Sequence, residues 1–157
     1  MKLRTLTRPE DRAAVRRIVE ATGFFSAEEV DIAAELVTEQ LEKGDDSGYH
    51  LVFAEEGDVT LGYCCFGPIP ATEGSFDVYW IAVAPEGQRR GIGRALLAET
   101  ERVVRGLGGK RIWIDTSERE QYVPTHRFYE SAGYALAARL VDFYRPGEAK
   151  VIFRKSV

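Results

Sequence analysis

A glycine-rich turn near the middle of the chain carries the residues best suited to chemistry. Gly91 and Gly93 stand between an apolar run and a segment with helical periodicity, and three arginines lie beside them, Arg89, Arg90 and Arg94. A helix N-terminus offers unpaired N–H groups and a partial positive charge. Glycines let an anion approach the backbone closely, because they have no side chain. The turn therefore predicts a site for a pyrophosphate group.

The same Gly-x-Gly pattern also begins the dinucleotide-binding fingerprint. Asp115 lies about 20 residues further on, where that fingerprint places an acidic residue. Against this interpretation, Leu96 occupies the position of the third glycine, and a loop with Pro85 separates the apolar run from the glycines. The chain is also too short for two βαβαβ halves. The phosphate-loop pattern is absent, because no Gly-Lys-Ser or Gly-Lys-Thr occurs in the turn.

The elements that must position this turn follow from hydrophobic periodicity and end signals. Apolar and alternating runs predict strands at residues 3–6, 49–55, 59–66, 75–83, 111–115, 134–144 and 150–154. Helical periodicity predicts helices at residues 7–23, 26–44, 91–107 and 124–131. Thr7 is the expected N-cap of the first helix, and Ser26 with Glu29 forms a capping box for the second. This order predicts one mixed α/β domain over residues 1–157.

Composition and charge narrow the function classes. The chain has 157 residues and a net charge of −4, and its basic residues form no long run. We therefore expect no nucleic-acid binding, which needs clustered cations. No apolar stretch approaches the roughly 20 residues that cross a bilayer, and the N-terminus lacks a signal-peptide core, so we expect a cytoplasmic protein without membrane attachment. The two cysteines and two histidines show no metal-ligand spacing, and no metal site is predicted.

The glycine-rich turn resembles the acetyl-CoA-binding motif of the GCN5-related N-acetyltransferase (GNAT) superfamily. The core of that motif is Gln/Arg-x-x-Gly-x-Gly/Ala, and the stretch from Gln88 to Gly93 matches it at every defined position. The preceding Ile81-Ala82-Val83-x-Pro85 is similar to the strand and exit of the family. The resemblance covers nearly the whole chain, because the predicted element order is also that of the family. It implies a mixed, mostly antiparallel, splayed sheet flanked by helices.

The resemblance also implies how acetyl-CoA binds as a cosubstrate. The residues implied to contact it are Ile81, Ala82, Val83, Gln88, Arg89, Arg90, Gly91, Ile92, Gly93, Arg94, Thr125 and Phe128. Backbone N–H groups of the turn should hold the pyrophosphate, and the strand should pair with the pantetheine arm like an added β-strand. The small residues Ala82 and Ala84 leave a longer acyl-CoA donor open as an alternative.

A second constellation, from Pro124 to Tyr134, resembles the last core helix of the family. The resemblance implies that Tyr129 donates a proton to the departing thiolate. A tyrosine hydroxyl titrates near about 10 and a thiol near about 8.5, so the tyrosine remains protonated. The alternative is a tyrosine that only packs in the core. Members of the family often carry Asn and Ala where this chain has Tyr122 and Thr125, so an Asn-type contact to the cofactor is not expected.

A general base is less clearly indicated by the sequence. In a regular strand, Asp77 and Tyr79 would lie on the face opposite Val78 and Trp80, and Glu73 precedes that strand in a loop. Any of these three polar side chains can take a proton directly or through water. We take Asp77 as the candidate catalytic base, with an ordered water as the alternative.

Together, these features predict an N-acetyltransferase that moves acetyl from acetyl-CoA to a primary amine of a small molecule or a peptide by direct attack. The resemblance places the acceptor cleft between the loop that carries Phe24 and Phe25 and the segment after Tyr134. The alternative from another class is a non-catalytic acyl-CoA-binding sensor or interaction module of the same fold. The resemblance also allows a homodimer, although no residue pattern identifies an interface.

Overall fold

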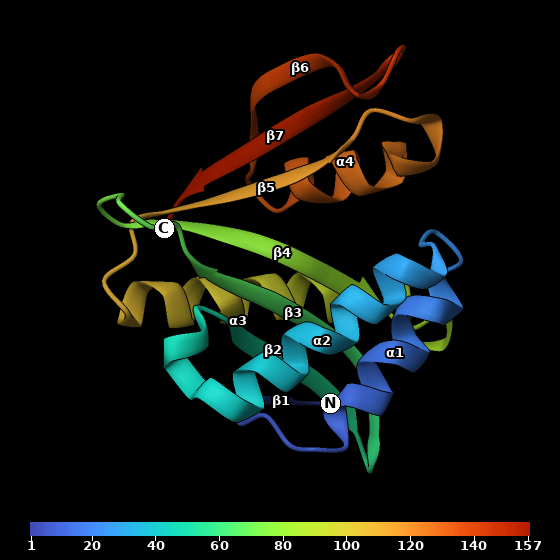
Figure 1. Ribbon diagram of the computed structural model, residues 1–157, viewed down its shortest axis with the longest axis vertical. Coiled ribbons are helices and arrows are strands. Elements are labelled where there is room, and N and C mark those ends of the chain that lie inside the picture. The colour runs from blue at the N-terminus through green and yellow to red at the C-terminus, as the bar shows by residue number, and fades with distance from the viewer.

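Seven strands form one sheet in the order β1-β2-β3-β4-β5-β7-β6 in the computed structural model, which describes residues 1–157 (Figure 1). The strands are β1 (Lys2–Arg4), β2 (His50–Glu56), β3 (Val59–Pro68), β4 (Ser75–Val83), β5 (Arg111–Ser117), β6 (Ala135–Arg145) and β7 (Glu148–Ser156). The helices are α1 (Asp11–Thr22), α2 (Ala27–Lys43), α3 (Ile92–Gly106) and α4 (Val123–Ser131), with 3₁₀ turns η1 (Gly44–Ser47), η2 (Pro85–Gly87) and η3 (Glu120–Tyr122). Only β4 and β5 pair in parallel. The predicted mixed, mostly antiparallel α/β fold is confirmed.

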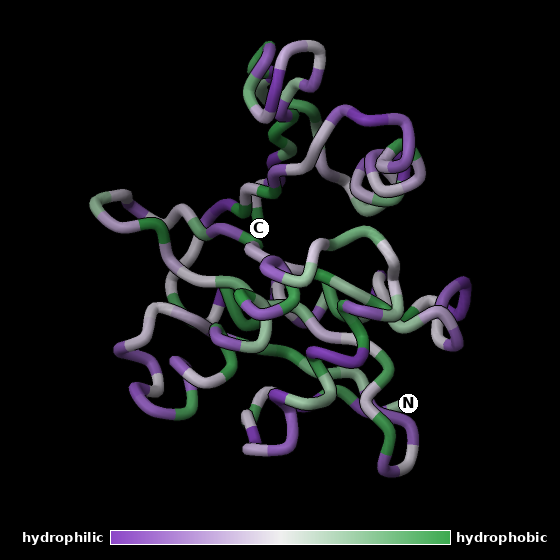
Figure 2. Tube along the Cα trace, turned by 45° about the vertical axis from the view of Figure 1, so that its right-hand side comes forward, coloured by the Kyte–Doolittle hydropathy of each residue, from purple (hydrophilic) through white to green (hydrophobic).

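Two hydrophobic cores lie on opposite faces of the sheet. Helices α1 and α2 contribute Val15 and Val37 to a core that contains Phe53 of β2. Helix α3 contributes Leu96 to the other core, and α4 contributes Tyr129. Figure 2 shows the corresponding pattern, with hydrophobic stretches in the interior and hydrophilic residues in many of the outer turns. Strands β2, β3 and β4 alternate apolar side chains between the two cores, whereas β5 and β7 contribute buried apolar side chains only to the core that contains α3 and α4.

The sheet splays apart between β4 and β5. Their pairing runs from Ser75 opposite Arg111 to Val78 opposite Ile114 and then stops, although β4 continues to Val83 and β5 continues beyond Ile114. Figure 1 shows the two strands together at one end and diverging toward the other. The second half of β4 is therefore paired with β3 on one side only. This confirms the expected splay and leaves one backbone edge of β4 open inside the sheet.

A β-bulge at Tyr79 corrects one expectation. Residue Cys65 of β3 pairs with Trp80 and the next residue, Phe66, pairs with Val78, so Tyr79 is the extra residue. Val78 belongs to the α3/α4 core, whereas Trp80 packs against the α1/α2 core. The prediction that Val78 and Trp80 share one face was wrong, because a bulge shifts the alternation of side chains by one position.

The entry to the first helix also differs from the prediction. Strand β1 ends at Arg4, and helix α1 begins at Asp11 with Glu10 at the N-cap position and no side-chain cap. The Asp11 carboxylate accepts a hydrogen bond from the backbone N–H of Arg8 at 2.6 Å and binds the Arg4 guanidinium. These contacts place the helix start after Pro9, so Thr7 is not the cap.

None of the helices is both long enough and apolar enough to cross a bilayer. The two cysteines are unbonded and buried, Cys64 in the α3/α4 core and Cys65 in the α1/α2 core. Burial raises the pKa of the Cys64 thiol to about 12. Both thiols therefore act as apolar filling.

Candidate functional site

The glycine-rich turn connects the open half of β4 to helix α3. After β4 the chain passes through η2, and Gly91 then adopts a left-handed conformation with φ of 77° at the N-cap position of α3. No side chain caps this helix. The N–H groups of the first turn of α3 therefore have no side-chain acceptor, which is the arrangement that binds anions.

The side chains of the turn stabilise its shape and border its surface. The Gln88 amide nitrogen donates to the Val83 carbonyl at 3.2 Å, which ties the turn to the end of β4. Arg89 adopts a positive φ of 62°. The Arg90 guanidinium pairs with Glu56, whereas Arg94 donates to the Ser131 hydroxyl at 3.2 Å. Arg94 therefore links the start of α3 to α4, and Arg90 points toward the β2–β3 turn.

Gly93 marks a close approach between helices α3 and α4. A Cβ atom built on Gly93 would lie 3.1 Å from the Cζ atom of Phe128. Thr125 lies on the same helix as Phe128 and is half-buried. Ile92 is 2% exposed and anchors the first turn of α3 in the core. The structure thus brings Gly93 and Phe128 into contact although the two residues are far apart in the sequence.

The strand residues expected to hold a cofactor lie on the open edge of β4. Ile81 and Val83 are half-buried and pack against the α3/α4 core, and Ala82 is buried in the α1/α2 core. Their partners across the ladder are Cys64, Tyr63 and Gly62 of β3. The other edge of this stretch has no strand beside it. An extended ligand can therefore take the place of a strand there.

Tyr129 lies in the α3/α4 core on helix α4 and is 4% exposed. Its ring packs against Phe128 and Phe153, with centroid distances of 5.6 Å and 5.7 Å. Burial raises its pKa well above the usual tyrosine value, and the nearby Cys64 and Asp115 raise it further. The hydroxyl is therefore held protonated at neutral pH.

The three candidate bases occupy different surroundings. Asp77 is half-buried on β4, and its pKa is raised by burial first and by Asp115 second, whereas Lys150 lowers it. Tyr79 is 40% exposed and packs edge-on against Tyr49 at 5.5 Å. The Glu73 side chain is 93% exposed. Of the three, Asp77 is the carboxylate that lies on β4, one residue before the pairing of β4 with β5 ends.

Sequence reasoning missed two residues of this region. Asp115 of β5 raises the pKa of both Asp77 and Tyr129, and it lies two positions after Trp113, the residue opposite Asp77. Lys150 of β7 binds the Asp115 carboxylate at 2.8 Å. In the sequence, Asp115 fitted only the acidic position of a dinucleotide-binding fingerprint, and no pattern indicated a role for Lys150. Their proximity depends on strand pairing across the sheet, so no local signal in the sequence could have revealed it.

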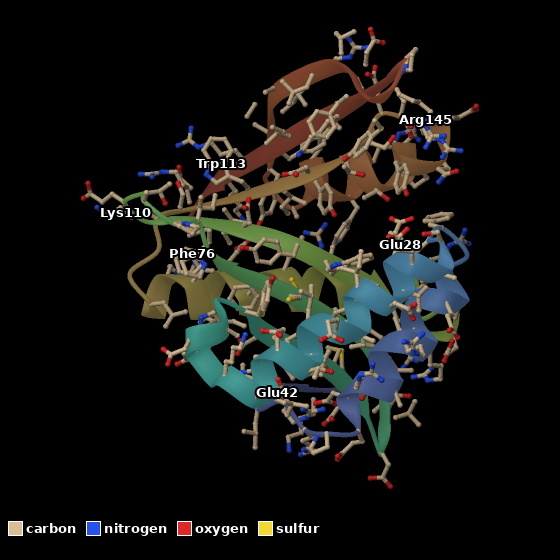
Figure 3. All side chains as sticks on the ribbon, in the orientation of Figure 1. Glu28, Glu42, Phe76, Lys110, Trp113 and Arg145 are labelled. Atoms are coloured by element: carbon tan, nitrogen blue, oxygen red, sulfur yellow. The ribbon has the colours of Figure 1, made fainter.

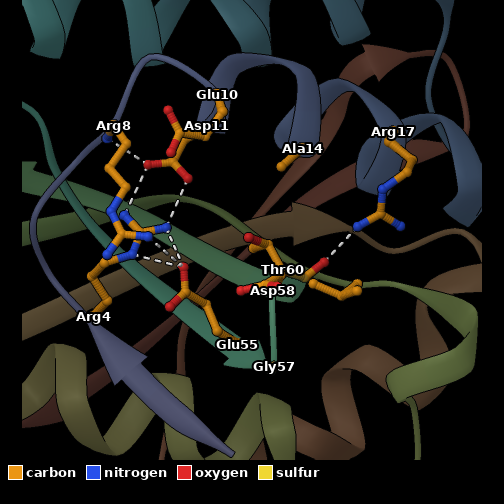
Figure 4. Close-up of a pocket in the computed structure, with 11 residues that line it drawn as sticks. Arg4, Arg8, Glu10, Asp11, Ala14, Arg17, Glu55, Gly57, Asp58 and Thr60 are labelled. Atoms are coloured by element: carbon orange, nitrogen blue, oxygen red, sulfur yellow. Dashed lines mark hydrogen bonds and ion pairs between the residues drawn. The ribbon is translucent and has the colours of Figure 1, made fainter.

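A surface hollow lies elsewhere on the molecule. It measures about 420 Å³ and is lined by Arg4, Asp11, Arg17, Glu55 and their neighbours around β1, α1 and the β2–β3 turn (Figure 4). Within it, the Arg4 guanidinium contacts Asp11 at 2.8 Å and Glu55 at 2.6 Å. Most of its lining residues are charged, and the central ones, Arg4, Asp11 and Glu55, pair with one another. We therefore assign this hollow a structural role. The candidate functional site is the region where β4 and β5 separate.

No group of three or more His, Cys, Asp or Glu side chains is arranged to hold a metal ion. The site is thus built from a helix N-terminus, an open strand edge, a buried tyrosine and a pair of carboxylates. This combination can hold an extended phosphate-bearing ligand and move protons at the point where the sheet divides.

Comparison with known proteins identifies the relatives of this chain. The sequence model of the acetyltransferase (GNAT) family matches residues 13–134. A GNAT-family protein from Desulfovibrio desulfuricans has 52% sequence identity and a TM-score of 0.97, over 99% of this chain and 98% of that chain. No curated protein sequence matches this chain.

More distant solved structures share the fold. An aminoglycoside 6'-N-acetyltransferase complexed with coenzyme A has 17% identity and a TM-score of 0.80, with 99% of this chain and 97% of that chain covered. The ribosomal-protein-S18-alanine N-acetyltransferase from Escherichia coli has 19% identity and a TM-score of 0.76, with 99% and 93% covered.

Proposed function

This chain belongs to the acetyltransferase (GNAT) family, and we propose that it transfers an acetyl group from acetyl-CoA to a primary amine of a small molecule or a peptide. The observation that carries the proposal is the open edge of β4 directly before an uncapped helix N-terminus. Coenzyme A has an extended pantetheine arm joined to a pyrophosphate. Its two parts match these two features in chemistry and in order along the chain.

The cofactor would be held mainly by backbone groups. The pyrophosphate would accept hydrogen bonds from the N–H groups between Arg89 and Arg94 at the start of α3. The pantetheine amides would pair with the stretch from Ile81 to Val83, as an added strand would. Thr125 and Phe128 of α4 would border the arm on its far side, because Phe128 already contacts the first turn of α3.

The reaction forms one bond and breaks one. The amine nitrogen attacks the thioester carbonyl carbon, the carbon–sulfur bond breaks, and the thiolate leaves. Asp77 takes the proton that the amine loses, directly or through water, and Tyr129 supplies a proton to sulfur. A backbone N–H beside the bulge of β4 can polarise the carbonyl oxygen. The protons balance once Asp77 releases one to water and Tyr129 regains one.

The acceptor would approach from the wide end of the splay. Phe24, in the turn between α1 and α2, packs edge-on against Tyr122 of η3 at 5.7 Å, so these two segments meet there. In the view of Figure 3, Glu28 and Arg145 lie below and above this end of the molecule. Structural neighbours include an enzyme named for aminoglycosides and one named for a ribosomal-protein alanine, which are amines of both proposed kinds.

Replacement of Tyr129 by phenylalanine tests the catalytic role. We expect kcat to fall by about 100-fold or more, because a positioned acid contributes that much. The affinity for acetyl-CoA should stay close to that of the wild type, since the ring remains. Turnover is measured by thiol release with a panel of amines, and binding is measured as the rise in the unfolding midpoint with acetyl-CoA.

Gly91→Glu provides the control for binding, because it places a carboxylate where the pyrophosphate would lie and strains a residue with positive φ. The midpoint rise should vanish in this variant. A folded wild type that shows no midpoint rise with any acyl-CoA would refute the proposed function. Binding without turnover on any amine would instead indicate a non-catalytic CoA-binding module.

A further inference from the structure

Lys150 of β7 is held by two contacts, one with Asp115 of β5 and one with Phe143 of β6. Its ammonium binds the Asp115 carboxylate at 2.8 Å, with the lysine side chain only 20% exposed. The same ammonium lies 4.4 Å from the centroid of the Phe143 ring, a distance at which a cation is attracted to an aromatic face. The lysine is therefore fixed between β5 and β6 rather than extended into solvent.

An irregular stretch of β6 positions Phe143, the aromatic residue that contacts Lys150. The pairing of β6 with β7 shifts between Leu140 and Arg145, and Asp142 adopts a positive φ of 57°. The Asp142 carboxylate accepts a hydrogen bond from the Gly147 N–H at 2.8 Å, which fixes the bulged segment. Phe143 then lies over Lys150. The irregular pairing of β6 and the turn after it therefore place an aromatic ring against the Lys150 ammonium.

The charged and titratable groups on this side of the sheet come from four strands. Asp77 lies opposite Trp113 of β5, two positions before Asp115, so both carboxylates face the same side of the sheet. Lys150 of β7 is the cation that acts on Asp77, and Tyr79 of β4 is the tyrosine on which Asp77 acts. Tyr144 of β6 lies near Asp115 and Lys150.

Two arginines on this side are engaged with other partners. Arg111 donates to the Glu73 carbonyl at 2.9 Å and to the Ser75 hydroxyl at 3.2 Å. The Arg154 guanidinium lies 5.6 Å from the Trp113 ring centroid. Lys150 is therefore the cation positioned to offset the Asp115 carboxylate.

We propose that Lys150 is a positioning residue for acetyl transfer, whose clamped ammonium balances the Asp115 carboxylate so that Asp77 can accept the proton of the amine at neutral pH. The inference rests on the proposed function, in which Asp77 is the base. It assigns a role to the Asp115–Lys150 pair that neither the motif nor the family match suggests.

The surroundings of Asp77 act on its pKa in opposite directions. Burial and the Asp115 charge both raise the pKa of Asp77, and the Lys150 charge lowers it. A base works only in its ionised form, so activity is present above its pKa and is lost as the pH falls through it. Loss of Lys150 should move the acidic limb of the kcat/KM profile to higher pH. Loss of the Asp115 charge should move that limb to lower pH.

The test compares pH profiles of kcat/KM for the wild type, Lys150→Met, Lys150→Arg and Asp115→Asn. Lys150→Met should have its acidic limb at higher pH than the wild type, and on the falling part of the limb a displacement of one pH unit corresponds to about a tenfold lower kcat/KM at a given pH. Lys150→Arg keeps the charge and should restore the wild-type limb. The acidic limb of the double variant, Lys150→Met with Asp115→Asn, should lie between the limbs of the two single variants, because the opposing charges are removed together.

Lys43→Met is the matched control, since Lys43 pairs with Glu39 at 2.7 Å on an exposed face of α2. Its profile should superimpose on that of the wild type. An acidic limb that is the same in wild type, Lys150→Met and Asp115→Asn would overturn the inference. If Lys150→Met does not fold, as judged by circular dichroism, the test is whether the acidic limb of Asp115→Asn moves to lower pH than that of the wild type.

The two proposals fail in different ways. A wild type without acetyl transfer to any amine contradicts the proposed function. An active wild type with an impaired Asp77→Asn variant, but with unshifted limbs in the Lys150 and Asp115 variants, contradicts only the role of Lys150.

Discussion

Replacement of Asp11 by alanine should destabilise the protein far more than its position near the N-terminus suggests. Its carboxylate binds the Arg4 guanidinium through two hydrogen bonds of 2.8 Å and 2.9 Å and also accepts the Arg8 N–H. The side chains of Arg4 and Asp11 are only 6% and 1% exposed. Loss of one partner leaves a buried charge with incomplete compensation.

The expected cost follows from this burial. Breaking a buried ion pair by removal of one partner typically costs about 3–5 kcal/mol, whereas an exposed pair contributes about 0.2–1 kcal/mol. Glu55 still accepts from Arg4 at 2.8 Å, so the lower end of the range applies. For a chain of this size, about 3 kcal/mol lowers the unfolding midpoint by about 6–12 °C.

Urea unfolding followed by tryptophan fluorescence measures this change. Trp80 packs against Phe25 near α1, and Trp113 lies on β5, so the two report on different parts of the sheet. Lys43→Ala removes an exposed pair and serves as the comparison. A cost for Asp11→Ala of less than about 1 kcal/mol, equal to that of the exposed pair, would refute the reasoning.

Two further variants probe the binding surfaces. Gly93→Ala places a Cβ atom 3.1 Å from the Phe128 ring and should weaken acetyl-CoA binding about tenfold in calorimetric titration. Gly106→Ala, at the other end of α3 and with open space around its Cβ, should leave that affinity unchanged. Phe24→Ala removes the 5.7 Å contact with Tyr122 and should raise the KM of the amine about threefold. An equal rise in the KM of acetyl-CoA would contradict a role confined to the acceptor side.

Local patterns predicted most of the elements correctly. The capping box of α2 is present, with the Ser26 hydroxyl accepting from the Glu29 N–H and the Glu29 carboxylate accepting from the Ser26 N–H. Gly23 ends α1 with a φ of 74°. Such caps involve residues three or four positions apart, so the sequence alone carries the information. The glycine-rich turn belongs to the same class, since its conformation depends on neighbouring residues.

Errors arose where distant strands or side chains decide the conformation. Thr7 has the side chain of an N-cap, but the Arg4–Asp11 contact sets the start of α1. The face on which Trp80 lies depends on a bulge against β3, which no pattern within β4 reveals. The Asp115–Lys150 pair joins residues 35 positions apart, as their numbers show. Each case requires knowledge of pairing across the sheet.

The open edge of β4 and the uncapped start of α3 present main-chain groups, which all residues except proline share. The unpaired main-chain groups of Ile81–Val83 therefore depend on the extended strand and its open edge, whereas the side chains of these residues pack in the two cores. The start of α3 depends in the same way on backbone conformation, as at Gly91 with its φ of 77°. The coenzyme A complex at 17% identity keeps the fold with a TM-score of 0.80. Under the proposed function, main-chain groups hold acetyl-CoA and side chains hold the amine, so substitutions at the acceptor end would change the amine without changing the cosubstrate site.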